Sequence, residues 1–107
     1  MSRYSLTPAA EQDIDESVSF IASNSPTAAV RWLDRIEAVC EKFVEYPAMG
    51  VCRPALGIGV RAFPVENYVI YYRRKGKEIH VLRVLHAARD VTSAFENTVA
   101  EVNPGES

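Results

Sequence analysis

The sequence predicts an α+β domain of order β-α-α-β-β-β, with a helical hairpin packed on one face of a small antiparallel sheet. Two helix-start signals, Thr7-Pro8 and Ser25-Pro26, each precede a stretch of helical apolar periodicity. After residue 60 the chain changes to runs of β-branched and aromatic residues separated by turn signals. Its length of 107 residues suits one domain, which we expect to span 1–107.

The first two elements are a short strand over residues 3–6 and a helix that stops near Asn24. Thr7 suits the N-cap, and Pro8 suits the first helical position. One apolar stripe follows, made of Ala10, Ile14, Val18 and Ile21. Acidic residues near the helix N-terminus, where negative charge is favoured, are Glu11, Asp13, Asp15 and Glu16.

The second helix begins with the same signal, Ser25-Pro26, and ends before Tyr46-Pro47. Its apolar face consists of Ala29, Trp32, Leu33, Ile36, Cys40 and Phe43. The connection between the two helices is only a few residues long. Such a short connection predicts an antiparallel hairpin.

The second half of the chain predicts a loop and then a three-stranded meander. Residues 47–59 contain two prolines and three glycines and read as a long, potentially functional loop. Strands are expected over 60–65, 68–74 and 78–86. The last has apolar residues on both faces, which favours an interior position. A short helix could follow over 91–100, and we expect a flexible tail over about 96–107. The sheet face away from the hairpin should be partly open.

Charge is unevenly distributed although the chain carries a net charge of only −2. Residues 1–52 sum to −4, residues 53–90 to +5 and the remainder to −3. The positive segment could meet an anionic partner or could form the solvated rim of the sheet. The chain as a whole is too acidic for a general nucleic-acid binder, so no sequence-specific nucleic-acid binding is expected.

The sequence offers few ligands for a metal or cofactor. Two cysteines and two histidines at these spacings match no zinc motif, and no nucleotide-binding glycine motif is present. We therefore expect no metal and no cofactor. No apolar run is long enough to cross a bilayer, and the first residues do not resemble a secretory signal, so we expect a cytoplasmic protein.

Residues 81–90, VLRVLHAARD, concentrate the polar groups of interest. His86 could act as a general base, or it could satisfy a backbone group at the strand end. Strand alternation places Arg83 and His86 on opposite faces unless a bulge intervenes, which argues against a compact catalytic cluster. Asp90 suits the N-cap of the following helix, accepting from the amides of Thr92 or Ser93. Arg89 would then be available to a partner.

The chain resembles the ParE toxins of the RelE/ParE superfamily. The resemblance covers residues 3 to 90 and rests on the opening strand and helices, the PAMG loop at 47–50, Arg61, the YVIYY run at 68–72 and, most specifically, LRVLHAARD at 82–90. It implies a toxin of a bacterial type II toxin–antitoxin module, held in a hetero-oligomer by a ParD-like antitoxin and inhibiting DNA gyrase.

The alternative that the superfamily offers is a RelE-like toxin that cuts mRNA on the ribosome without a metal. Val69 where that branch tends to place an arginine, Phe95 where a tyrosine would serve, and the acidic composition all favour the ParE-like branch. We expect no catalytic residue. Residues expected to bind the antitoxin or the target are Arg61, Arg73, Arg83, His86 and Arg89.

Overall fold

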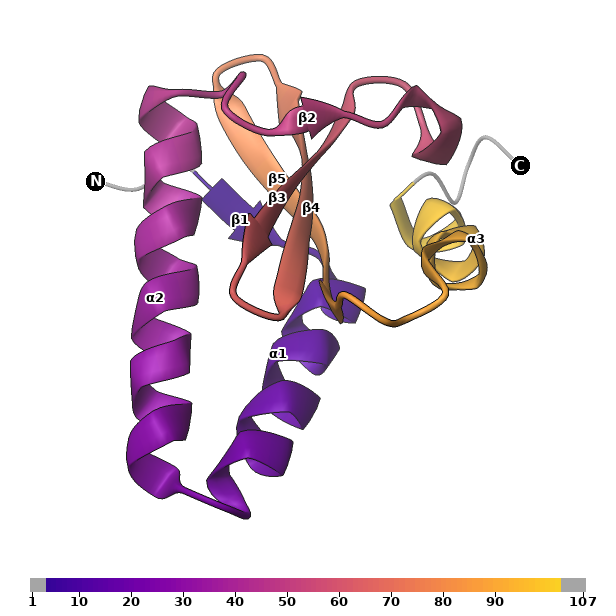
Figure 1. The fold of residues 1–107 in the computed structure, drawn as a ribbon. Helices are drawn as coiled ribbons and strands as arrows, with labels where there is room; N and C mark the ends of the chain where they lie inside the picture. The colour runs from indigo at the N-terminus through magenta and orange to yellow at the C-terminus, as the bar shows by residue number, and fades with distance from the viewer. Residues whose placement is uncertain (1–3, 103–107) are drawn as a thin grey trace.

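The computed structural model describes residues 4–102, with side chains described as far as Glu96. Its centre is a five-stranded sheet of order β1-β5-β4-β3-β2 (Figure 1). The strands are β1 (Tyr4–Leu6), β2 (Val51–Cys52), β3 (Val60–Val65), β4 (Tyr68–Lys75) and β5 (Glu78–His86). β1 pairs in parallel with β5, and the other neighbours are antiparallel. The interior position expected for the last strand is confirmed, because β5 lies between β1 and β4.

Two helices, α1 (Pro8–Ala22) and α2 (Pro26–Glu45), form the predicted hairpin. The Thr7 hydroxyl caps α1 by accepting from the amide of Ala10 at 3.1 Å, and it donates to the carbonyl of Leu82 at 2.8 Å. Ser25 caps α2 by accepting from the amide of Ala28 at 3.1 Å. Each proline lies at the first helical position, where its missing N–H removes no helical bond.

The main core lies between the hairpin and one face of the sheet. Its buried helix residues include Trp32, Ile36 and Phe43, which pack on residues of the sheet. The ring of Phe43 stacks on that of Tyr72, with centroids 3.8 Å apart. The periodicity of the sequence therefore identified the buried face of α2 correctly.

A third helix covers part of the sheet face that was expected to be partly open. α3 (Val91–Val102) lies on the side of the sheet away from α2 (Figure 1). Its Ala94 and Phe95 are buried against the sheet, and Phe95 meets Tyr71 edge-on at 5.2 Å. Residues 96–102 are thus helical rather than part of an irregular tail, and residues 103–107 lie outside the described part of the chain.

The predicted loop over 47–59 also contains regular structure. β2 (Val51–Cys52) adds an edge strand to β3, and a 3-10 turn (Pro54–Leu56) follows. The sequence did not predict β2, because a two-residue strand has no periodicity of its own. Its neighbours supply the pairing: Val51 lies across from Ala62, and Cys52 lies across from Arg61.

A bulge in β5 changes the alternation that strand geometry alone predicts. Tyr71 lies across from Arg83 but Tyr72 lies across from Val81, so Leu82 is the extra residue. Val81 therefore packs in the hairpin-side core together with Val84, although simple alternation along a strand would place Val81 on the same face as Arg83. Beyond the bulge, Val84 and His86 share the hairpin-side face, because they lie across from Ile70 and Tyr68.

Candidate functional site

Arg83 is buried, not available to a partner as the sequence had suggested. Only 7% of the residue is exposed. Its guanidinium donates from Nε and Nη2 to the two carboxylate oxygens of Asp13 at 2.7 and 2.8 Å, and from Nη1 to the carbonyl of Ala94 at 2.8 Å. The amide of Val84 also donates to Asp13, at 3.0 Å. Arg83 therefore ties β5 to α1 and α3.

Asp13 is the residue that the sequence reasoning missed. The sequence suggested for it only the general role of an acid near the N-terminus of the first helix, yet it is 6% exposed. A signal was present in the spacing: Asp13 follows Ala9 by four positions and Ala10 by three, so it lies on the buried face of α1. A carboxylate buried on an apolar helix face requires a cation or hydrogen-bond donors, and the guanidinium of Arg83 forms a bidentate ion pair with it.

Arg61 holds a loop. It donates to the carbonyls of Gly50 at 2.7 Å and Ala48 at 3.3 Å. The hydroxyl of Tyr72 supports the same loop by donating to the carbonyl of Pro47 and accepting from the amide of Gly50, both at 2.8 Å. Burial raises the pKa of this phenol. A Cβ at Gly50 would lie 2.8 Å from the Tyr72 ring and hydroxyl, so the PAMG loop requires glycine there.

His86 and Arg89 are exposed at the end of β5. The Nδ1 of His86 accepts from the amide of Ala88 at 3.1 Å, and its ring lies edge-on to Tyr68 with centroids 5.3 Å apart. Both residues line a shallow hollow of about 150 Å³ with Phe20, which is 71% exposed. His86 thus makes the backbone contact that was considered for it, while Arg89 faces solvent.

Arg83 and His86 lie on opposite faces of the sheet. Arg83 lies across from Tyr71 on the α3 side, and His86 lies across from Tyr68 on the hairpin side. The buried guanidinium and the exposed imidazole cannot act on one substrate atom. Arg73 is a third separate case, because it lies on β4 beside Gly59, half-buried.

Asp90 accepts hydrogen bonds at the start of α3. Its Oδ1 receives the amides of Thr92 at 3.2 Å and Ser93 at 3.4 Å, and its Oδ2 receives the hydroxyl of Ser93 at 3.2 Å. This is the geometry of a helix N-cap. The carboxylate fixes where the chain leaves the sheet and turns back over its face.

A groove between α1, α2 and β1 has a volume of about 490 Å³. Its apolar walls are formed by Tyr4, Leu6, Ile14, Leu33, Ile36 and Cys40, and its acidic side chains are Glu11, Asp15 and Glu37. Burial, followed by the charges of Glu37 and Glu41, raises the pKa of the Cys40 thiol to about 12. Burial also raises the pKa of Tyr4, and the nearby acids add to it. The groove is therefore apolar inside and negative at its rim.

Two kinds of site do not appear in the described residues. The side chains described between Tyr4 and Glu96 contain no group of three histidine, cysteine or carboxylate residues placed to hold a metal ion. No helix in this range is long and apolar enough to cross a membrane.

Comparisons with known proteins point to one family. The family model for the ParE toxin of the type II toxin–antitoxin system parDE matches residues 4–91. The chain is 30% identical over 86 residues to Toxin ParE3 of Caulobacter vibrioides, covering 79% of this chain and 86% of that protein.

A solved structure described as a chromosomal ParDE TA system from P. aeruginosa shares the fold. Its TM-score is 0.66 at 26% sequence identity, covering 80% of this chain and 96% of that one. The sheet, the helical hairpin and the match over residues 4–91 agree with the resemblance carried by LRVLHAARD. The chain belongs to the ParE toxin family of type II toxin–antitoxin systems.

Proposed function

We propose that this ParE-family toxin acts by binding, that its target is DNA gyrase, and that a ParD-like antitoxin neutralises it in the bacterial cytoplasm. The observation that carries the proposal is the groove between α1, α2 and β1. An apolar hollow of about 490 Å³ can accept several side chains of a partner protein.

The chemistry of the groove defines the segment that would fill it. Apolar side chains of the antitoxin would pack against Ile14 and Leu33, and lysine or arginine side chains would meet Glu11, Asp15 and Glu37 at the rim. β1 pairs with β5 on one side, and among the described strands none pairs with its other edge. That edge offers backbone groups to an extended segment.

This proposal revises how the antitoxin was expected to bind. The sequence suggested that acids of the partner would meet arginines such as Arg83. Arg83 is instead saturated by Asp13 and Ala94, and Arg61 is committed to its own loop. The rim acids therefore replace them as the expected charged contacts.

The placement of the polar residues supports binding over RNA cleavage. A metal-independent nuclease needs cations and a proton-transfer group around one phosphate. Arg83 and His86 lie on opposite faces, and Phe95 is buried against Tyr71. RelE-like cleavage of mRNA is consequently the weaker candidate.

The antitoxin site can be tested by reversing one charge at the rim. Replacing Glu37 with Lys should weaken binding of the ParD-like protein encoded beside this gene by about tenfold, because a like charge would meet the partner's cation. The matched control is Glu45→Lys, also exposed on α2 but outside the groove. Isothermal titration of both variants gives the comparison, and equal affinities would place the antitoxin elsewhere.

The target can be tested with purified toxin in two assays. We expect inhibition of supercoiling by gyrase and no ribosome-dependent cleavage of mRNA. His86→Gln should retain full inhibition, since the variant keeps a hydrogen-bonding group and removes the titratable ring. Cleavage of mRNA that falls by about 10²–10⁴-fold in His86→Gln would instead establish the nuclease.

A further inference from the structure

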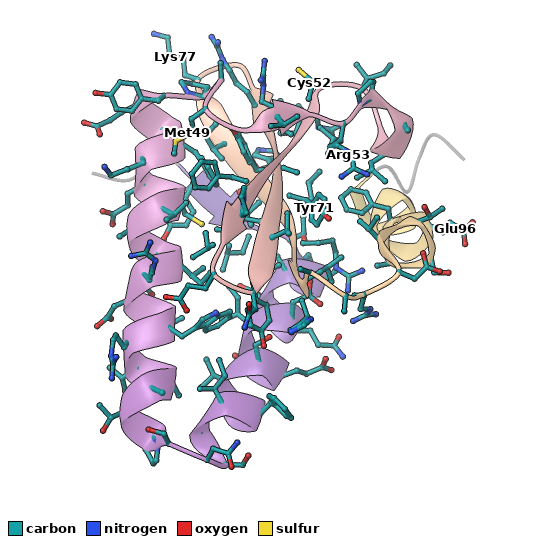
Figure 2. The ribbon with its side chains drawn as sticks, in the orientation of Figure 1. Met49, Cys52, Arg53, Tyr71, Lys77 and Glu96 are labelled. Atoms are coloured by element: carbon teal, nitrogen blue, oxygen red, sulfur yellow. The ribbon has the colours of Figure 1, made fainter. Side chains whose placement is uncertain are left out.

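The end of the sheet opposite the α1–α2 turn is strongly basic. It is formed by residues 51–60 and 73–80, which carry five cations and one acid, a net charge of +4 in a chain of net charge −2. The cations are Arg53, Arg73, Arg74, Lys75 and Lys77. Figure 2 shows Lys77, Cys52 and Arg53 around this end of the sheet. We call these five cations the basic end.

Strand pairing places Arg73 on the sheet face that α3 covers in part, close to Arg53, whereas Arg74 lies across from Ile79 on the hairpin side. Arg73 lies across from Val60 on one side and His80 on the other. The amide of Arg53 donates to the carbonyl of Val60 at 2.8 Å, and the stem of Arg73 lies beside Gly59. Arg53 and Arg73 therefore flank the same short turn, although twenty residues separate them in the sequence.

The basic end is not neutralised within the described residues. No ion pair there joins Arg53, Arg73, Lys75 or Lys77 to a carboxylate, and Glu78 lies 3.5 Å from His80. Five cations close together repel one another unless an anion is present. The described residues supply no carboxylate that would offset this repulsion.

An exposed isoleucine distinguishes this surface from a merely solvated rim. Ile58 is 91% exposed, on a turn closed by the bonds Gly57 N–H to Pro54 O and Val60 N–H to Gly57 O. Val51, on the adjoining edge strand, is 67% exposed. This turn therefore presents an apolar side chain beside the cations, where a partner surface could contact both.

We infer that the basic end binds the phosphodiester backbone of duplex DNA, a contact that rests on the proposed action on gyrase and extends it to the DNA that gyrase holds. The basic end is opposite in sign to the groove, so a partner that complements the acidic rim would be repelled here. Arginine and lysine are the usual donors to DNA phosphates, and an apolar side chain beside them can press between base steps.

The size of the contact explains why the toxin is not a general DNA binder. About four phosphate contacts give a salt slope of roughly −3.6 in log K against log salt, so affinity should fall about 10²-fold between 50 and 200 mM salt. The acidic side chains of the α1–α2 hairpin repel phosphates and so oppose binding of the whole chain to free DNA. The contact between the basic end and DNA therefore adds to the affinity of the toxin for gyrase, which supplies most of the binding.

Direct binding is measured by fluorescence anisotropy with a labelled duplex of about 20 base pairs at several salt concentrations. The double variant Lys75→Glu/Lys77→Glu changes exposed positions at the β4–β5 turn. It should lose at least tenfold in affinity for the duplex and most of the salt slope. The control Arg31→Glu/Lys42→Glu makes the same charge change on exposed positions of α2 and should lose less. Arg73→Gln, checked by thermal melting, is a second loss-of-binding variant that removes one cation without reversing it.

Four results would overturn the inference. The first is wild-type binding without salt dependence, and the second is no binding at 50 mM salt. The third is an equal loss of affinity in Lys75→Glu/Lys77→Glu and in the α2 control. The fourth is tighter binding of a polyglutamate peptide or a single-stranded RNA of matched charge, which would assign the basic end to an acidic protein or to RNA.

The supercoiling assay separates this inference from the proposed function. If wild-type toxin inhibits gyrase and Lys75→Glu/Lys77→Glu inhibits with unchanged potency, the DNA contact is wrong and the target stands. If wild-type toxin does not inhibit gyrase, the proposed target is wrong and the anisotropy measurement alone decides the DNA contact. A variant that folds, keeps antitoxin binding and inhibits at least tenfold less potently supports both.

Discussion

At the scale of residues, the carboxylate of Asp13 organises donors from β5 around one buried point. It accepts two bonds from Arg83 and one from the amide of Val84. Arg83 in turn reaches the carbonyl of Ala94 in α3. Three elements that are distant in sequence thus depend on a single pair of charges, which is stable only while both are present.

Removing one of these charges should be costly. Asp13→Ala leaves the guanidinium of Arg83 buried without its carboxylate, so we expect a loss of about 3–5 kcal/mol in the free energy of unfolding. Asp15→Ala removes an exposed acid from the same helix and should change stability by less than about 0.5 kcal/mol. Urea denaturation of the two variants checks the prediction, and a loss below 1 kcal/mol for Asp13→Ala would contradict it.

The two cysteines should differ sharply in reactivity. Cys40 is buried and its pKa is raised to about 12, so almost none of it is thiolate at pH 8. Cys52 is exposed on the edge strand β2. Brief treatment of the native protein with iodoacetamide at pH 8 should therefore add one alkyl group, detected by mass, and Cys52→Ser should abolish it. Rapid double labelling of the folded chain would show that the groove wall opens.

At the scale of elements, α3 determines how much of the sheet is exposed. Phe95 and Ala94 pack in one buried cluster with Tyr71, Leu82 and Leu85, and this cluster extends to Leu56 and Val60. The direction of α3 is set where it begins, at the Asp90 cap. A short helix thus divides one sheet face into a buried part and an open part.

The cap of α3 can be tested by comparing two substitutions of Asp90. Asp90→Ala removes the acceptor of two backbone amides and should cost about 1 kcal/mol. Asp90→Asn keeps an oxygen acceptor and should cost only a few tenths of that. Thermal melts give the stabilities, and amide hydrogen exchange within α3 localises the effect. Equal stabilities of Asp90→Ala and the wild-type chain would show that packing alone holds α3.

At the scale of the whole molecule, charge and apolar surface are segregated. The hairpin side carries an apolar groove with an acidic rim, and the opposite end of the sheet carries the basic end beside Ile58. Both surfaces expose apolar side chains, and burying them against a partner would be favourable for a chain of 107 residues. These two surfaces match the two partners of opposite charge that are proposed above.

Expression should consequently depend on a partner. We expect the chain to accumulate in quantity only when the protein encoded beside it is produced too, because the partner both covers the groove and prevents toxicity. The measurement is growth and soluble yield with and without co-expression. A stable, harmless monomer obtained in high yield alone would count against the toxin–antitoxin arrangement for this copy.

The sequence determined the elements whose signals are local. Local residue patterns predicted the helix starts at Thr7-Pro8 and Ser25-Pro26, the apolar face of α2, the strands other than β2 and the cap at Asp90. LRVLHAARD was also sufficient to indicate the family. Each of these depends on residue type and spacing along the chain, which the sequence states directly.

Only the tertiary structure decided which polar side chains remain available. Asp13 and Arg83 are separated by 70 positions, and either could have faced water until α1 was placed against β5. The bulge at Leu82 shifts the alternation of β5, and α3 covers part of the sheet face away from the hairpin. Whether a charged side chain is buried in an ion pair or exposed to a partner depends on the elements that pack against it. Those elements are brought together by long-range contacts.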